Sequence, residues 1–368
     1  MKFVMERDAA LRALGFTNRV VARRNTVPIL AHALVTAGKS KISFRGTDMD
    51  RLLDAEVVGG GSAKTGSTTV NAANLLSFVR ATADGSQIEA ELNGDKLTLR
   101  AGRARVLLPT LPVADFPTLK ADDSYVEVDV AGETLTKAID RVAHAMSNET
   151  TRYYLNGIYL YRHGERLRLV ATDGHRLAWT EFVASSILPE QLPGVIIPRQ
   201  SIGELKALAT EAKGDDLSLE ISTTGLRCVG QNLEFHTKLV DGTFPDYQRV
   251  IPDQHDCQFT TTSAALSAAV TRCASLGDNT HGVKLEISKG TAQLSRNHPD
   301  AGSISDEIDV ELTTKPAATG FNSAYMLEAL HALGSQSVEI GFTPGAPILL
   351  RDPAHRDGHM QVVMAMRV

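Results

Sequence analysis

The residues with the clearest catalytic potential are an aspartate and a histidine separated by one glycine, in the stretch Ala171-Thr-Asp-Gly-His-Arg-Leu177. Asp173 and His175 could serve a hydrolase as an acid–base pair. Such a pair also needs a nucleophile or a metal, and the chain has no HExxH, GxSxG or Walker motif. Asp-Gly between two strands is also a signal for a tight turn. A hydrolase stays open as an alternative, but the pattern does not favour it.

Two other stretches could bind a partner. Arg152-Tyr153-Tyr154 could contact a phosphate backbone, or the tyrosines could simply cap the core. The closing stretch Val362-Val-Met-Ala-Met-Arg-Val368 is apolar and contains two methionines, whereas chain ends are usually polar. Methionine suits a groove that accepts differing side chains. We therefore expect a last strand over Val362–Met364, a docking surface, or both.

The elements that must position these residues occur in three repeats. Asn71, Pro198 and Asn322 each open a helical pattern after a β-rich stretch, and they lie 127 and 124 residues apart. The Phe-Pro pairs at Phe116 and Phe244 are 128 residues apart. A period near 125 indicates three whole domains of one fold, because solenoid repeats have periods of about 20–50 residues.

Each repeat has the order strand, helix, strands, helix, strands. In the middle repeat we predict strands at 126–130, 157–161, 167–171, 177–183, 217–221, 225–229 and 234–239, and helices at 133–144 and 201–212. Corresponding units are predicted at 1–5 and 8–21, and at 258–261 and 264–273. Strands such as Ser218-Leu-Glu-Ile alternate polar and apolar residues, as in a sheet with one buried face. The fold class is α+β, with an antiparallel sheet and two helices in each of three domains, at 1–122, 123–253 and 254–368.

Six inward-facing helices per chain would make half of a closed ring. In a two-fold dimer, twelve helices about 10 Å wide trace roughly 120 Å and leave a hole of about 28 Å, enough for duplex DNA. A three-domain arc could instead be a scaffold that never closes and does not bind DNA.

Composition is that of an ordinary globular protein, with 43% hydrophobic and 22% charged residues. No apolar run approaches the roughly 18 residues of a membrane span. The acidic residues Glu6 and Asp8 come too early in the chain for the apolar region of a secretory signal. Cys228, Cys257 and Cys273 lack CxxC spacing, so we expect reduced packing residues in a cytoplasmic protein without structural zinc. No cofactor is expected.

Net charge is −5, but charge is uneven along the chain. Residues 256–368 hold 12 acidic against 8 basic side chains. The first helix and the residues after it carry five arginines: Arg7, Arg12, Arg19, Arg23 and Arg24. An acidic protein with one basic surface for DNA is therefore possible on charge grounds.

Several motifs together resemble the bacterial sliding clamps, the beta subunits of DNA polymerase III, over the full length. They are Arg24 with Thr26-Val-Pro-Ile-Leu30, Leu111-Pro-Val-Ala-Asp-Phe-Pro117, Arg152-Tyr-Tyr-Leu-Asn-Gly157, Val170-Ala-Thr-Asp-Gly-His-Arg-Leu-Ala178, Lys238-Leu-Val-Asp-Gly-Thr-Phe-Pro-Asp-Tyr247 and the closing Val-Val-Met-Ala-Met-Arg. The resemblance implies a head-to-tail homodimeric ring that encircles double-stranded DNA without sequence specificity. It implies a processivity factor with no catalytic site, working on the nucleoid in the cytoplasm.

The resemblance also implies site residues. DNA contacts would come from Arg24, Arg80, Lys137, Arg141, Arg152, Tyr153, Tyr154, Arg199 and Lys206. A pocket between the middle and last domains would bind short linear peptides with Leu-Phe-like anchors, carried by the polymerase III alpha subunit, the clamp loader, other polymerases and repair proteins. It would comprise Leu155, Thr172, Gly174, His175, Arg176, Leu177, Pro245, Arg249, Val250, Val363, Met364, Met366 and Arg367.

For ring closure, the resemblance implies that the last strand of the first domain meets the third domain of the other chain. Arg103, Arg105 and Leu108 would face Leu276, Asp300, Asp306 and Glu307. Two features depart from the family pattern. Ala365 stands where the family often has proline, and Glu149 lies in a loop expected to approach phosphate.

Overall fold

The computed structural model describes residues 1–22, 26–118, 124–212, 214–277, 282–356 and 358–368. These form two compact units. Unit 1 comprises Met1–Glu133, Ser185–Leu192 and Gly203–Leu239, and unit 2 comprises Thr134–Ala184, Pro193–Ile202 and Val240–Val368. No helix among these residues is long and apolar enough to cross a membrane.

Unit 1 is built on one antiparallel sheet, whose strand order is β10-β15-β16-β17-β4-β3-β2-β6-β9-β8-β7-β1-β5. Its strands are β1 (Lys2–Glu6), β2 (His32–Ala37), β3 (Ile42–Thr47), β4 (Arg51–Val57), β5 (Gly61–Lys64), β6 (Gly66–Asn71), β7 (Gln87–Asn93), β8 (Lys96–Ala101), β9 (Ala104–Leu111), β10 (Val126–Ala131), β15 (Asp216–Ile221), β16 (Gly225–Val229) and β17 (Leu233–Lys238). Helices α1 (Arg7–Val20) and α2 (Ala72–Ala81) pack against each other.

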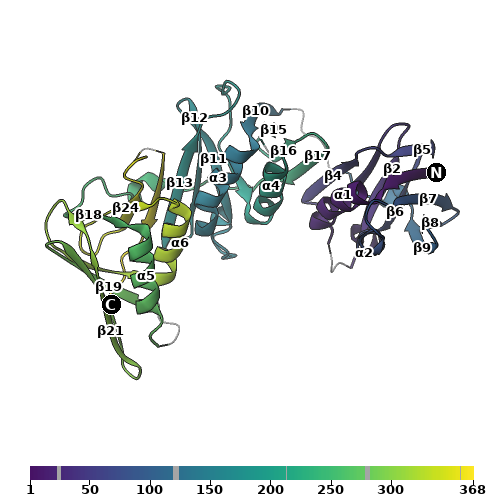
Figure 1. Ribbon diagram of the computed structural model, residues 1–368. Helices are drawn as coiled ribbons and strands as arrows, with labels where there is room; N and C mark the ends of the chain where they lie inside the picture. The colour runs from purple at the N-terminus through teal and green to yellow at the C-terminus, as the bar shows by residue number, and fades with distance from the viewer. Residues whose placement is uncertain (23–25, 119–123, 213, 278–281, 357) are drawn as a thin grey trace. The chain divides into compact units, whose positions relative to one another are not determined.

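Unit 2 contains two antiparallel sheets. The larger has the order β14-β11-β12-β13-β26-β25-β24-β18-β22, and the smaller β21-β20-β19-β23. Their strands are β11 (Gly157–His163), β12 (Arg166–Thr172), β13 (Arg176–Phe182), β14 (Val195–Pro198), β18 (Cys257–Thr262), β19 (Gly282–Ser288), β20 (Thr291–His298), β21 (Gly302–Asp309), β22 (Glu311–Leu312), β23 (Ala318–Asn322), β24 (Ser337–Phe342), β25 (Ile348–Arg351) and β26 (His359–Val363). Helices α5 (Ser263–Ala274) and α6 (Ser323–Leu333) lie side by side (Figure 1). Helices α3 (Gly132–Val142) and α4 (Arg199–Glu211) contribute residues to both units.

Two seams explain why the compact units do not follow the sequence repeats. Strand β17 of the middle repeat pairs with β4 of the first, and β13 of the middle repeat pairs with β26 of the last. Each seam continues a hydrogen-bonded sheet across a repeat boundary. The boundaries 1–122, 123–253 and 254–368 stay a prediction.

The residues that mark the repeats have a local structural reason. Asn71 accepts a hydrogen bond from the Asn74 N–H at the start of α2, and Asn322 accepts from the Ala324 and Tyr325 N–H groups at the start of α6. These are N-caps, which satisfy backbone donors that have no partner within the helix. Pro198 directly precedes α4. The elements predicted in the middle repeat are confirmed, with ends shifted by one or two residues.

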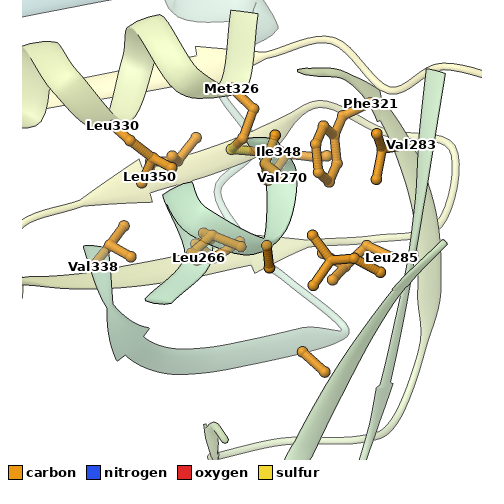
Figure 2. Close-up of a cluster of buried hydrophobic side chains, with 14 of the residues drawn as sticks. Leu266, Val270, Val283, Leu285, Phe321, Met326, Leu330, Val338, Ile348 and Leu350 are labelled. Carbon is orange, nitrogen blue, oxygen red and sulfur yellow. The ribbon is translucent and has the colours of Figure 1, made fainter. Parts of the chain in front are cut away.

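The core of the last repeat lies between α5, α6 and the sheets of unit 2. Figure 2 shows Leu266 and Val270 of α5 at the centre of the cluster, with Met326 and Leu330 of α6 above them and Val283 and Leu285 of β19 to the right. All six side chains are buried. Cys257 and Cys273 belong to this cluster, and with Cys228 they are buried free thiols, as predicted.

Candidate functional site

An open cavity of about 260 Å³ lies within unit 2. Its lining residues come from five places: the 3-10 turn Tyr153–Leu155, the end of β12, the start of β13, the segment 245–250 and the end of β26. They are Arg152, Tyr154, Leu155, Thr172, Gly174, Arg176, Leu177, Pro245, Asp246, Tyr247, Val250, Val362 and Met364. We call this cavity the pocket.

The turn between β12 and β13 forms one side of the pocket. The Thr172 hydroxyl accepts from the Gly174 N–H at 3.2 Å, and the Asp173 carboxylate accepts from the His175 and Arg176 N–H groups at 2.9 and 3.0 Å. Gly174 has φ of +87°, and a Cβ there would lie 2.7 Å from Arg152 Nη1. Glycine therefore provides both the left-handed conformation and the space for the arginine.

The same turn recurs in the first repeat. The Asp48 carboxylate accepts from the Asp50 and Arg51 N–H groups at 3.1 and 2.7 Å, and Met49 takes a positive φ of 79°. The hydrogen bonds of Asp173 are thus those of a repeated turn and do not form an acid–base dyad with the His175 ring, which stacks on Tyr325. No group of three or more His, Cys, Asp and Glu side chains within the described residues could hold a metal ion.

The pocket has an apolar wall and a charged rim. Leu155, Leu177 and Val362 are buried in one cluster behind it, whereas Met364 and Val250 are 39% and 45% exposed. Apolar side chains that remain exposed in a concave site indicate binding of an apolar ligand group.

Rim charges are paired within the chain. Arg152 donates to Glu149 at 2.9 and 3.0 Å, and Arg249 donates to Asp246 at 2.8 Å. Arg176 pairs with Asp173 at 3.1 Å and with Glu328 of α6, and its guanidinium lies 4.5 Å from the Tyr325 ring centroid. The formal charges at the rim therefore largely cancel, and a ligand in the pocket would obtain most of its affinity from the apolar wall.

A buried polar network holds Tyr247 in the pocket. The Tyr247 and Tyr161 hydroxyls are 2.6 Å apart, and Arg168 donates to the Tyr247 hydroxyl at 2.9 Å. Arg168 also pairs with Glu181 at 2.5 Å and stacks 4.3 Å from the Trp179 ring centroid. Burial, then the bond to Tyr247, raises the pKa of Tyr161.

We expect Tyr247→Phe to destabilise the protein, because it removes one partner each of Tyr161 and Arg168 in a buried site. The free energy of unfolding should fall by about 1–3 kcal/mol. Urea denaturation followed by Trp179 fluorescence measures this. The exposed Tyr153, replaced by Phe in the same way, should leave stability unchanged, and equal losses in both variants would contradict the network's role.

The His144 imidazole lies near Arg176 and is mostly buried. Burial, then the Arg176 charge, lowers the pKa of His144 from 6.5 to about 4, so the ring is neutral in the folded protein at pH 7. Its Nδ1 has no hydrogen-bond partner among the residues that the structure describes. The unfolded chain binds a proton at about pH 6.5, whereas the folded chain does so only near pH 4.

His144 should therefore make stability fall as pH drops from 6.5 to 4, by roughly 2–3 kcal/mol for this group. We expect His144→Asn to lose less stability over that interval than the unmodified protein. Urea denaturation at a series of pH values gives the two slopes, and parallel slopes would contradict the assignment. The other histidines are common to both proteins and cancel in the difference.

Comparisons with known proteins agree with this architecture. Three family models match the chain: DNA polymerase III beta subunit, N-terminal domain at residues 1–120, central domain at 129–246 and C-terminal domain at 248–367. The beta sliding clamps of Caulobacter vibrioides and Escherichia coli K12 are 37% and 33% identical over 382 and 371 aligned residues, which cover 100% of both chains in each case. The chain belongs to the bacterial sliding clamps.

Solved clamp structures match it as well. The DNA polymerase III subunit beta of Pseudomonas aeruginosa has a TM-score of 0.95 at 34% identity, and the Bartonella birtlesii clamp bound to griselimycin has 0.95 at 36%, both over 100% of each chain. A sliding clamp is a non-catalytic processivity subunit of the polymerase, so the hydrolase alternative is excluded.

Eight of the predicted pocket residues line the pocket of this clamp. They are Leu155, Thr172, Gly174, Arg176, Leu177, Pro245, Val250 and Met364. Five others do not line it: His175, Arg249, Val363, Met366 and Arg367. Val363 is fully buried in the core of the last repeat, and Val362 faces the pocket in its place, because adjacent strand residues point to opposite faces.

Sequence reasoning missed five lining residues as pocket residues: Arg152, Tyr154, Asp246, Tyr247 and Val362. Arg152 and Tyr154 had been predicted as DNA contacts. Asp246 and Tyr247 close the Phe-Pro-Asp-Tyr motif, so that motif could have pointed to them.

The predicted DNA contacts fall into different environments. Arg80, Lys137, Tyr153 and Arg199 are exposed. Arg141 is partly buried, which lowers its pKa, and donates to Thr180 at 3.4 Å. Arg24, with Arg23, lies outside the described residues.

The arginines of α1 are not a free basic stripe. Arg12 pairs with Glu211 at 2.6 Å, Arg19 donates to the Gly203 carbonyl at 3.1 Å, and Arg7 pairs with Asp84 at 2.8 Å. Arg51 of β4 also pairs with Glu204 at 3.3 Å. The contacts of Arg12, Arg19 and Arg51 join the first repeat to the middle repeat beside the pairing of β4 with β17. The helix is therefore less basic than its sequence suggests.

The residues predicted at the dimer interface stay a prediction, and they differ in exposure. Leu108 is buried in the first repeat at 6% exposure, whereas its neighbour Leu107 is 48% exposed. Arg103 and Arg105 are exposed, as are Asp300 and Glu307, and Leu276 is half-buried. Asp306 pairs with Arg272 of its own chain at 2.5 Å, so it is already neutralised.

Proposed function

We propose that two copies of this chain close head to tail into a ring that encircles duplex DNA and slides along it. Such a ring keeps a bound polymerase at high local concentration, because rebinding becomes a local event. In this proposal the clamp works on the nucleoid in the cytoplasm. The polymerase III alpha subunit, the clamp loader, other polymerases and repair proteins attach through the pocket.

Two strand edges support the closure. Strand β9 pairs with β8 along its length but with β6 only at Thr110 and Leu111, so Ala104–Pro109 have one unpaired edge. Strand β21 is the edge of its sheet and, among the described strands, pairs only with β20. An edge strand with unpaired N–H and C=O groups is a template for another strand. If β9 paired with β21 of a second copy, the sheet would continue from one copy into the other. The pairings of β17 with β4 and of β13 with β26 continue sheets between repeats of one chain in the same way.

Charge at these edges is complementary. Arg103 and Arg105 lie at the start of β9, whereas Glu307 and Asp309 lie on β21, and all four are exposed. Leu107 would supply the apolar contact between them. A contact between two different surfaces on each copy is heterologous, and it forms a ring where the rotation closes.

Non-specific contacts to DNA would come from exposed cations on the helices. Arg80 lies in the last turn of α2, Lys137 in α3 and Arg199 at the start of α4. Arg199 also donates to the Met146 carbonyl at 2.8 Å, which holds its side chain. Diffuse contacts to phosphate need no base readout and weaken with salt, as sliding requires.

The observation that carries the peptide-binding part of the proposal is the pocket itself. Exposed Val250 and Met364 stand over a buried wall of Leu155, Leu177 and Val362. Leucine and phenylalanine side chains of a linear peptide would bury against this wall, which is how short motifs obtain affinity in hydrophobic grooves.

The test of the whole proposal is retention on circular against linearised duplex DNA, after loading by a cognate clamp loader, in salt that removes electrostatic binders. A ring should stay on the circle and leave after linearisation. Equal release from both DNAs would contradict closure and favour a scaffold that does not encircle DNA. The control is circular DNA mixed with the protein without the clamp loader. In that sample the protein should not be retained on the DNA.

A further inference from the structure

The segment Ala365–Val368 does not enter the pocket but docks on a neighbouring strand. The Met364 N–H donates to the His175 carbonyl at 2.9 Å, and this is the last hydrogen bond between the β26 strand and the β13 strand. Ala365 then forms an antiparallel bridge with Phe321 of β23, and the Met366 N–H donates to the Gly320 carbonyl at 2.8 Å. Since β23 is the edge of its sheet, the segment adds a short strand to that edge.

Two glycines leave the space in which the end of this segment packs. A Cβ at Gly282 of β19 would lie 2.6 Å from Val368 Cγ1, and a Cβ at Gly320 of β23 would lie 2.5 Å from the Met366 carbonyl oxygen and overlap Val368 Cγ2. Neither glycine has a left-handed φ. Glycine within a strand often marks the close approach of another segment. Here both positions leave the space that Val368 fills.

Met364 lies between two attachments. The preceding residue, Val363, is buried and pairs with Arg176 of β13. The following residue, Ala365, forms the bridge with Phe321 of β23. The Met364 side chain is 39% exposed and lines the pocket. An exposed methionine has many rotamers, and ordering its backbone in advance reduces the entropy that a ligand must remove.

We propose that Val368, seated on Gly282 and Gly320, is a positioning residue for the pocket. It holds the closing segment on β23 and thereby keeps Met364 in place as one wall for the apolar anchors of a linear peptide. The inference rests on the proposed peptide-binding function, and it assigns to two strand glycines a role in partner affinity although neither lines the pocket.

A double-mutant cycle tests this on the full chain. Gly282→Ala adds a methyl group where Val368 Cγ1 lies, and Val368→Ala removes that Cγ1. The probe is a fluorescein-labelled peptide ending in Leu-Phe, with affinity measured by anisotropy. We expect Gly282→Ala to weaken binding about five-fold and Val368→Ala about three-fold. The double variant should bind about as well as Val368→Ala and better than Gly282→Ala, because the new methyl group fills the vacated space.

A second readout follows Met364 directly. In a sample with ¹³C-labelled methionine methyl groups, the Met364 signal, assigned with Met364→Leu, should shift and change width in both single variants while the unfolding temperature stays within about 2 °C. Unchanged affinity and an unchanged Met364 signal in Val368→Ala would overturn the proposal. If the unmodified clamp fails to bind the probe, the peptide-binding function is wrong, and the methyl signal alone then decides whether Val368 positions Met364.

Discussion

Val250→Asp should remove peptide binding from the pocket. Val250 lines the cavity and is 45% exposed before any ligand binds, so the substitution leaves the folded core intact. A bound peptide would bury the new carboxylate against the apolar wall, and the nearby Arg152 already pairs with Glu149. We expect at least about 30-fold weaker binding of a labelled peptide ending in Leu-Phe, which is the scale of an interface hot spot.

The matched control is Val183→Asp. Val183 is 61% exposed, belongs to the same unit and does not line the pocket. Val183→Asp should bind the peptide with the affinity of the unmodified clamp. The free energy of unfolding of both variants should lie within about 0.5 kcal/mol of the value for the unmodified clamp. Equal affinities for the two variants would mean that the peptide binds elsewhere.

Leu107→Asp should open the ring. Leu107 is 48% exposed on β9, at the edge proposed to pair with β21 of the other copy. Its replacement buries an unpaired carboxylate in that contact and adds negative charge opposite the acidic strand. We expect the dimer to weaken by at least about 30-fold, so that the variant sediments as a monomer at concentrations where the unmodified clamp is dimeric.

Retention on circular DNA should be lost with the dimer. Val58→Asp is the control, since Val58 is 57% exposed in the turn after β4 and lies on no proposed interface. A Leu107→Asp protein that remains dimeric would place the closure elsewhere on the chain. Val58→Asp should remain dimeric and stay on the circle.

Local signals predicted the elements well. Helix starts at Asn71 and Asn322 follow from capping, which depends on residues only three positions apart. Strand patterns such as 225–229 follow from the period of two. These signals act within a few residues of chain, so the sequence contains them in full.

Local patterns did not show which of two adjacent apolar strand residues points outward. Val363 is predicted in the pocket, but Val362 lines the cavity and Val363 is buried. On β9, Leu107 is exposed, whereas Leu108, predicted at the dimer interface, is buried within its own chain. Both residues of each pair are apolar, so hydrophobicity could not choose between them. The pairing of β9 with β8 and of β26 with β13 sets which one points outward.

Charges were misjudged for another reason. Arg12 and Arg19 look like a basic stripe in the sequence, but Glu211 and the Gly203 carbonyl, more than 180 residues later, are their partners. Likewise, the family resemblance places Met366 in the pocket, yet the Met366 N–H donates to the Gly320 carbonyl and the closing segment docks on β23. These partners lie far away in the chain, so the spacing of residues in the sequence does not reveal them.

The sequence by itself determined the three repeats, the α+β class and the clamp family, because repeats, caps and motifs are local or directly comparable. The tertiary structure decided which residue of each apolar pair faces outward, which arginines are neutralised and where the closing segment docks. Those depend on strand register and on partners distant in sequence, which only the folded chain brings together.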